Sequence, residues 1–419
     1  MLFDLEVLSN GEKKIIRFDN ERNLFFNPET DEPYLAEHRT RDYRRYSPIY
    51  DIKKNDIGVL FINLGLNCNF SCKYCHQNKF RHNTKVENST PKKAADLLEK
   101  LKRSKLKPKA IALWGGEPLV YWKTMKVLIP GLRELYPDTK INFPTNGALL
   151  NSEILNFLTQ YDVGFYISYD GKTTNRDESI FDNPQLVADL KKFGKKIDIM
   201  PTQNRASIPI DSIRKEFDDM KIGLSSVAIY SIARCNPWNR EYADEIRIPK
   251  EKGSTHSEFI YRAIRQEVEN PELYKGLNER FNHIALMFYQ GLGIDSEEVH
   301  FCSNCTGRDV CIDVNGTIFS CMNIPLYEMG DIETFNPFNA THIYQNHLYK
   351  EECMECPFVT CCRGGCPLIH DCKSMEFKVN CNNQKIIAVP FFRNVVECLL
   401  GVYLKKVTRL SDGKVFGEF

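Results

Sequence analysis

The sequence predicts an α/β protein that combines a parallel sheet with a second region organised by cysteines. Apolar strand-like runs alternate with amphipathic helical patterns between about residues 58 and 235, and eleven of the sixteen cysteines lie between residues 302 and 381. Alternation of this kind is typical of a parallel sheet covered by helices. A chain of 419 residues is long enough for a catalytic core of about 200 residues and one or two accessory modules.

Residues 1–57 are predicted to form a β-rich extension. Turn-forming triplets such as Ser9-Asn10-Gly11 and Asn27-Pro28-Glu29 interrupt short strand-like runs, and the helical period is missing. We expect an edge strand of this segment to be available for pairing with an extended peptide.

Six β/α units are expected in residues 58–235. Their strands read as almost continuous apolar runs, which are typical of a parallel sheet buried on both faces, either doubly wound or curved into part of a barrel. Functional residues are then expected at the carboxyl ends of the strands. The predicted strands are residues 59–64, 110–114, 141–143, 163–168, 197–200 and 226–230.

Three further segments complete the predicted organisation. Residues 236–300 form a helical linker with a core-facing helix at 273–290, and residues 301–385 form a cysteine-rich domain poor in periodic structure. Residues 386–419 offer one apolar helix and then a hairpin around Ser411-Asp412-Gly413.

The composition argues for a cytoplasmic protein without a membrane segment. The 56 basic and 55 acidic residues nearly cancel, so binding to nucleic acid or to an anionic membrane is not expected. The first six residues lack the basic and apolar pattern of a secretory signal, and residues 386–404 are interrupted by Pro390 and Arg393. In a reducing compartment, so many cysteines favour metal or cluster ligation over disulfides.

Three cysteines, Cys68, Cys72 and Cys75, follow the first predicted strand directly. Three thiolates can hold three irons of a [4Fe–4S] cluster and leave the fourth iron open, whereas clusters that only transfer electrons usually take four. A zinc site completed by His76 and a set of unliganded buried cysteines are the alternatives.

The C-x3-C-x2-C spacing, with Tyr74 before the last cysteine, resembles the radical S-adenosylmethionine (radical SAM) superfamily. The resemblance implies a partial (β/α)6 TIM-like barrel whose open iron chelates the amino and carboxylate groups of S-adenosylmethionine. It also implies a 5′-deoxyadenosyl radical that abstracts hydrogen from an unactivated carbon, and a reductant such as flavodoxin or ferredoxin.

Further cofactor-binding candidates follow the next three strands. The segment Gly115-Gly116-Glu117-Pro118 resembles the GGEP motif of this family, with glycines that admit close approach of the ligand and a carboxylate suited to an ammonium group. A simple strand-to-helix turn started by Pro118 is the alternative. Asn146, in a Thr-Asn-Gly segment, and Ser168 and Asp170, in a Ser-x-Asp-Gly segment, resemble further family motifs, although Asn-Gly and Asp-Gly are also common turns. Where relatives carry an arginine for the cofactor carboxylate, residues 180–183 have no basic side chain.

The later cysteines resemble the SPASM extension of radical SAM enzymes that act on peptides and proteins. The resemblance implies two auxiliary [4Fe–4S] clusters, one held by Cys302, Cys305, Cys321 and Cys366 and the other by Cys353, Cys356, Cys362 and Cys381. Cys311 competes with Cys302, Cys361 with Cys362, and Cys372 with Cys381. A zinc ribbon of Cys353, Cys356, Cys362 and Cys366 stays open. Cys235 and Cys398 are expected to be ordinary buried cysteines.

These resemblances imply a maturase that acts on a ribosomally made precursor peptide with a leader sequence. The expected product is an intramolecular C–C or C–S crosslink, of thioether or cyclophane type; the sequence does not single out a general base. Sulfatase maturation is an alternative, but Met322 stands where that branch commonly has an aspartate. An RNA-modifying enzyme is a further alternative, based on the basic and aromatic residues 39–46. A non-catalytic iron–sulfur carrier would not need the GGEP and Ser-x-Asp-Gly segments.

Overall fold

The computed structural model divides into two compact units, each assembled from distant parts of the chain. One comprises residues 1–50, 247–301 and 344–419, and the other comprises residues 51–246 and 302–343. The predictions for residues 39–46, Cys302 and Cys305 fall outside the described residues. The structure describes residues 1–35, 56–80, 88–172, 179–229, 231–269, 277–289, 291, 309–323, 328–335, 350–366, 369 and 371–419.

The unit formed by residues 51–246 and 302–343 is built on a nine-stranded sheet of order β12-β11-β10-β4-β5-β6-β7-β8-β9. Strands β4 to β9 pair in parallel, each with the next along the chain. All six predicted strands are therefore present. They are β4 (Asp56–Asn63), β5 (Lys107–Trp114), β6 (Lys140–Thr145), β7 (Val163–Ile167), β8 (Ile197–Ile199) and β9 (Leu224–Val227).

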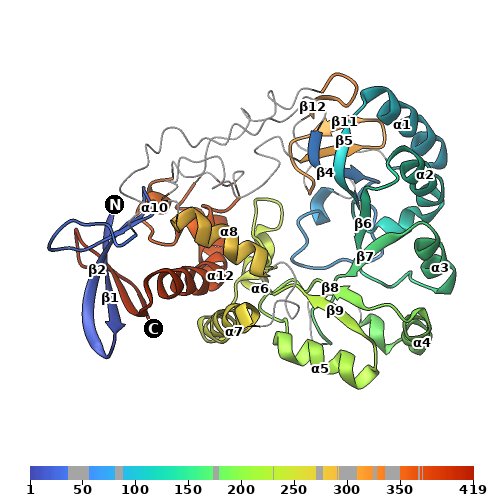
Figure 1. The fold of residues 1–419 in the computed structure, drawn as a ribbon. Helices are drawn as coiled ribbons and strands as arrows, with labels where there is room; N and C mark the ends of the chain where they lie inside the picture. Colours follow the sequence, from blue (N-terminus) through green and yellow to red (C-terminus); the bar gives the residue numbers. More distant parts are fainter. Residues whose placement is uncertain are drawn as a thin grey trace. The chain divides into compact units, whose positions relative to one another are not determined.

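Five helices connect these strands and lie along the outside of the curved sheet (Figure 1). Helices on one face indicate part of a barrel rather than a doubly wound sheet, which agrees with the predicted fold class. Polar side chains cap three of them; Thr90, for example, accepts a hydrogen bond from the Lys93 amide at 3.3 Å. The helices are α1 (Pro91–Ser104), α2 (Trp122–Leu135), α3 (Ser152–Gln160), α4 (Pro184–Phe193) and α5 (Ile210–Met220).

The start of the cysteine-rich region extends this sheet, which the sequence analysis did not predict. Strand β10 (Val310–Asp313) pairs in parallel with β4, and β11 (Thr317–Phe319) and β12 (Glu328–Asp331) follow in antiparallel order. Lys100 of α1 reaches Asp331 at 2.7 Å. The end of β12 is thereby held against α1.

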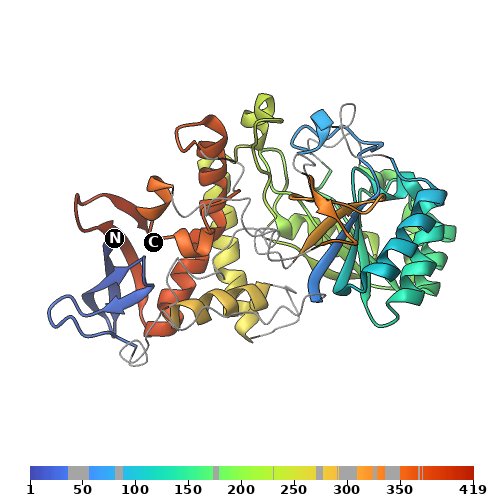
Figure 2. The same ribbon diagram turned by 90° about the horizontal axis from the view of Figure 1, so that it is seen from above.

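The unit formed by residues 1–50, 247–301 and 344–419 joins the two ends of the chain in one antiparallel sheet of order β14-β13-β1-β2-β3. In Figure 2 the blue N-terminal strands lie beside the red C-terminal strands. Strand β1 is central and the edge strands are β3 and β14, of which β3 is already bridged at Phe26 by Pro33. The strands are β1 (Leu2–Ser9), β2 (Glu12–Asp19), β3 (Leu24–Phe26), β13 (Tyr403–Arg409) and β14 (Val415–Glu418).

Long helices complete this unit. The predicted helix at 273–290 corresponds to α8 (Leu277–Tyr289), and the apolar helix predicted from residue 386 begins earlier, as α12 (Met375–Leu400). Ser374 caps α12 by accepting a hydrogen bond from the Phe377 amide at 3.1 Å. Among the described residues, no helix is long and apolar enough to cross a membrane. The remaining helices among the described residues are α6 (Ala243–Ile246), α7 (Lys250–Glu269), α10 (Glu351–Met354) and α11 (Val359–Cys362). Short 3-10 turns are η3 (Asn78–Phe80), η4 (Pro118–Tyr121), η5 (Ile180–Asp182) and η6 (Arg240–Tyr242).

Phenylalanine side chains form the core between this sheet and its helices. The Phe392 ring of α12 lies 5.3 Å from that of Phe18 and 6.0 Å from that of Phe288, and all three side chains are fully buried. We expect Phe392→Ala to lower the free energy of unfolding by about 3–5 kcal/mol, because it removes a large buried ring. Urea titration measures this loss, and Tyr403→Ala, at a position that is 63% exposed, is the matched control with a change within about 0.5 kcal/mol. Equal changes in the two variants would contradict this description of the core.

Candidate active site

A cavity of about 390 Å³ lies at the carboxyl ends of the parallel strands. The loops after β4 to β9 and the loop between β11 and β12 all contribute to it, as expected for a barrel of this type. It is lined by Cys68, Phe70, Cys72, Tyr74, Cys75, His76, Gln77, Trp114, Gly115, Gly116, Glu117, Pro144, Thr145, Asn146, Ser168, Met200, Thr202, Ser231, Ile232, Ala233, Arg234, Met322 and Asn323.

The three predicted cluster cysteines line this cavity together. The Phe70 amide donates a hydrogen bond to Cys68 Sγ at 3.4 Å, and the Gln77 amide donates one to Cys75 Sγ at the same distance. These backbone contacts fix the positions of the two sulfur atoms in the cysteine loop. Asn146 Nδ2 lies 3.9 Å from Cys68 Sγ and 2.7 Å from Asn69 Oδ1, which places the predicted Asn146 against the cysteine loop.

The two glycines after β5 pack directly on the backbone that leads into the cysteine loop. The Gly116 amide donates to the Gly65 carbonyl at 3.0 Å, and the Glu117 amide donates to the Asn67 carbonyl at 2.9 Å. A Cβ atom at Gly116 would lie 2.4 Å from the carbonyl oxygens of both Leu66 and Asn67. The glycines therefore permit the β4 and β5 loops to join, which positions Cys68.

The Glu117 carboxylate connects the β5 and β6 loops. Oε1 accepts hydrogen bonds from Leu119 N at 3.0 Å and Thr145 Oγ1 at 2.8 Å, and Oε2 accepts one from Asn146 N at 2.7 Å. The side chain is 2% exposed. Glu117 is thus a structural link as well as part of the cavity wall. Pro118 starts the short helix η4, as the alternative interpretation expected.

Asp170 connects the cysteine loop to the ends of two strands. Its carboxylate accepts hydrogen bonds from the Tyr74 hydroxyl and from Thr202 N, the latter at 2.6 Å. Asp170 is fully buried and is not among the described residues that line the cavity, whereas Ser168, which precedes it by two positions, is. The predicted role of Asp170 as a direct cofactor ligand stays a prediction, and the structure gives it a positioning role.

Arg234 carries the single fixed positive charge among the described residues of the cavity wall. The neighbouring His76 accepts a hydrogen bond at Nδ1 from Asn236 Nδ2 at 2.8 Å when its proton is on Nε2. Burial, together with the charge of Arg234, lowers the pKa of His76 to about 4, so His76 is neutral at physiological pH. A negatively charged ligand group in this cavity therefore has Arg234 as its cationic partner.

Thr202, Arg234 and Asn323 are among the lining residues that were not predicted from the sequence. Asn323 Oδ1 accepts a hydrogen bond from Trp114 Nε1 at 3.3 Å, which fixes the β11–β12 loop against the end of β5. The available signal for Thr202 was its position just after a predicted strand. Arg234 and Asn323 follow irregular segments, where spacing carries little information.

A second group of cysteines lines a small cavity of about 30 Å³ in the unit that contains α12. Its wall includes Cys353, Cys362, Cys366 and Cys381. Burial raises the pKa of Cys353 to about 12 and that of Cys356 to about 11, and Cys353, Cys356 and Cys381 each contribute to the electrostatic environment of Cys362. Cys353, Cys362 and Cys381 of the predicted set thus share this wall with Cys366, which was predicted for the other cluster. Cys356 is not among the described residues that line it, although it lies in the field of Cys381, so the predicted set stays a prediction.

The competing cysteines of this unit lie in different surroundings. Cys361 is 1% exposed and lies in the field of Arg280 and Arg363, and Cys372 interacts with Glu352. Contrary to expectation, Cys398 is exposed, because it lies on the solvent side of α12, while Cys235 is buried. Within the described ranges, no group of three or more His, Cys, Asp or Glu side chains forms a site for a single metal ion.

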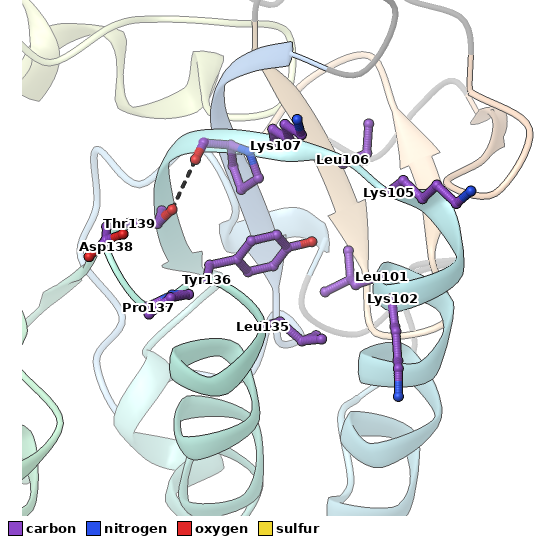
Figure 3. Close-up of a pocket in the computed structure, with 11 residues that line it drawn as sticks. Leu101, Lys102, Lys105, Leu106, Lys107, Leu135, Tyr136, Pro137, Asp138 and Thr139 are labelled. Atoms are coloured by element: carbon purple, nitrogen blue, oxygen red, sulfur yellow. Dashed lines mark hydrogen bonds between the residues drawn. The ribbon is translucent and has the colours of Figure 1, made fainter.

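A larger hollow of about 590 Å³ lies at the opposite, amino ends of β5 and β6 (Figure 3). Exposed lysines Lys102, Lys105 and Lys107 surround the Tyr136 ring there, and burial raises the pKa of Tyr136 to about 12. Its wall contains neither cysteines nor glycine-rich loops, so the chemistry-bearing residues are concentrated in the smaller cavity.

Comparisons with known proteins agree with this geometry. The model of the Radical SAM superfamily matches residues 62–178. The radical SAM cyclopropyl synthase TigE of Paramaledivibacter caminithermalis is 26% identical over 376 residues, which cover 82% of this chain and 74% of that protein. A serine-type anaerobic sulfatase-maturating enzyme of Bacteroides thetaiotaomicron is 24% identical over 349 residues, 73% of this chain and 81% of that protein.

The fold is also that of a solved structure, native anSMEcpe with bound AdoMet, at a TM-score of 0.57 and 17% identity, over 82% of this chain and 98% of that one. The match of residues 62–178 spans the cysteine loop, the GGEP segment and the Ser-x-Asp-Gly segment, three of the features that form the cavity at the carboxyl ends of the strands. The chain therefore carries a domain of the radical SAM superfamily and is a radical SAM enzyme.

Proposed function

We propose that the protein is a peptide-modifying radical SAM maturase whose catalytic [4Fe–4S] cluster is held by Cys68, Cys72 and Cys75. The observation that supports this most directly is the presence of the three thiols and the two glycines Gly115 and Gly116 in one cavity. When bound, the cluster and S-adenosylmethionine supply a one-electron cleavage that generates a radical able to take hydrogen from an unactivated carbon. The sulfur atoms of the three cysteines fit three irons and leave the fourth for the cofactor.

The cavity offers complementary side chains for the ammonium and carboxylate groups of the cofactor's methionyl moiety. Gly115 and Gly116 line the cavity after β5, and the acidic Glu117 lies beside them for an ammonium group. Ser168 and Arg234 provide a hydroxyl and a guanidinium group for a carboxylate. We expect Arg234 to provide the positively charged side chain for the cofactor carboxylate, since residues 180–183 have none.

We expect Arg234→Gln to weaken binding of S-adenosylmethionine by about ten- to hundredfold, because a hydrogen bond to a charged group contributes about 1.5–3 kcal/mol. Equilibrium dialysis of the reconstituted protein measures the dissociation constant directly. Arg205→Gln, a change at a guanidinium group that bonds the Asp244 carbonyl, is the matched control. Arg176→Gln tests the first arginine after the Ser-x-Asp-Gly segment. Weaker binding in Arg176→Gln together with unchanged binding in Arg234→Gln would overturn this role.

The second group of cysteines supports the proposal that the substrate is a peptide. Cys353, Cys356, Cys362 and Cys381 fit an auxiliary [4Fe–4S] cluster, and the predicted set with Cys302, Cys305, Cys321 and Cys366 would hold another. Two such clusters are what the resemblance to peptide-modifying enzymes implies, and the relationship to TigE and to a sulfatase-maturating enzyme supports a macromolecular substrate. A crosslink within a precursor peptide is the reaction we propose.

The reaction can be tested by label transfer. The reduced, reconstituted enzyme is incubated with S-adenosylmethionine and precursor peptides that carry deuterium on their side-chain carbons. We expect deuterium in the released 5′-deoxyadenosine and a peptide that has lost two hydrogen atoms, as one new C–C or C–S bond requires. Cofactor cleavage without deuterium transfer from any peptide would rule out peptide crosslinking while leaving radical SAM chemistry in place.

Sulfatase maturation is the second candidate, because a relative of this chain carries that name. In the structure Met322 lines the active-site cavity, and a thioether cannot accept a proton as an aspartate at this position would. A serine peptide that becomes an aldehyde, rather than a crosslinked product, would favour this candidate in the same assay.

A further inference from the structure

The cavity lined by Cys353, Cys362, Cys366 and Cys381 also contains a buried lysine, Lys350. The side chain is 9% exposed, although lysine is rarely buried without a partner. Lys350 lies on the turn just before α10, three residues ahead of Cys353, and its placement needs an explanation.

The loop between Cys362 and Cys366 holds the Lys350 ammonium group in place. Nζ lies 3.4 Å from the carbonyl oxygens of Gly364 and Cys366, and 5.4 Å from the centroid of the Phe377 ring. Gly364 and Gly365 have φ values of 66° and 78°, a left-handed conformation that glycine adopts without strain. The loop therefore presents its carbonyl groups to the lysine at the wall of the thiol cavity.

The position of this charge matters because four thiolates and a [4Fe–4S] cluster together are anionic. A cluster that accepts an electron becomes more negative still, and cluster potentials depend on net charge and solvent exposure. A cation fixed in a poorly hydrated site acts with little screening.

We propose that Lys350 is the counter-charge of the auxiliary cluster held by Cys353, Cys356, Cys362 and Cys381, and that it stabilises the reduced cluster. This assignment rests on the proposed function, since it requires that cluster. Lys350 is in this sense a positioning residue that acts through the cluster and not on the peptide.

The test is a redox titration followed by electron paramagnetic resonance, in full-length protein that carries the Cys68→Ala, Cys72→Ala and Cys75→Ala changes. Only auxiliary clusters then contribute to the signal. In Lys350→Gln, which keeps hydrogen-bond donors but loses the charge, we expect the ratio of reduced to oxidised cluster at a fixed potential to fall about tenfold for one component. For a one-electron couple this is about 59 mV. Lys350→Arg keeps the charge and should retain the wild-type ratio.

Lys378→Met is the matched control, because it removes the same charge from an exposed position of α12, where solvent screens it. An unchanged reduction potential in Lys350→Gln, with the cluster intact, would overturn the proposal. Equal loss of auxiliary iron in Lys350→Gln and Lys350→Arg would also overturn it, because it would show that the lysine side chain acts through packing. Loss of auxiliary iron in Lys350→Gln but not in Lys350→Arg would support the proposal, because it would show that the cluster needs a positive charge at this position. Absence of any auxiliary signal before Lys350 is changed would instead refute the auxiliary cluster of the proposed function.

Discussion

Simultaneous Cys68→Ala, Cys72→Ala and Cys75→Ala changes should abolish 5′-deoxyadenosine formation and lower the iron content from about twelve to about eight atoms per chain. The three thiols line one cavity and are the iron ligands we propose for the catalytic cluster. Without these thiols, the cluster whose open iron would bind S-adenosylmethionine loses its protein ligands. Iron and sulfide analysis after anaerobic reconstitution, together with chromatography of the nucleoside product, measures both effects.

Cys398→Ala is the control for this experiment, because Cys398 is exposed on α12 and is outside both groups of cavity cysteines. It should retain full iron content and full cofactor cleavage. Zinc in place of iron in the wild-type protein, or cleavage that survives the triple change, would mean that these cysteines do not hold the catalytic cluster.

The strands of the barrel could be predicted from the sequence because their signal is local. Each of β4 to β9 is a short, largely apolar run, and a fully buried parallel strand needs little else. The pairing of β1 with β13 is different, since Phe3 lies opposite Arg409 across about four hundred residues of chain. Nothing in the local sequence of either strand specifies its partner. The N-terminal and C-terminal segments were therefore predicted as separate parts of the protein.

In the active site, too, some residues could be predicted from the local sequence and others could not. Cys68, Cys72 and Cys75 were predicted because a thiol triplet at this spacing has few uses, and the structure places all three on one cavity. Arg234 could not be predicted, because it comes from an irregular loop after β9 and its relevance depends on where that loop folds. Asp170 shows the opposite case: a motif residue whose carboxylate the structure commits to Tyr74 and Thr202 N.

Gly116→Ala should have an effect almost as large as loss of the cysteines, although it leaves every thiol in place. The added Cβ would lie 2.4 Å from two backbone carbonyl oxygens, those of Leu66 and Asn67, so the clash cannot be relieved by rotating a side chain. The backbone that leads to Cys68 would have to move. Displacements of about 1 Å in an active site can cost about a hundredfold in rate, and overpacking typically costs about 1–3 kcal/mol.

We therefore expect Gly116→Ala to lower 5′-deoxyadenosine formation at least about a hundredfold, with partial loss of catalytic iron. Gly164→Ala is the matched control, because it adds the same methyl group on β7, where the nearest atom would be 3.7 Å away. Wild-type activity in Gly116→Ala would show that the β4 loop can shift without losing its function. If activity falls but S-adenosylmethionine binds normally, the glycine positions the cluster; if binding is lost as well, the same backbone contact also shapes the cofactor site.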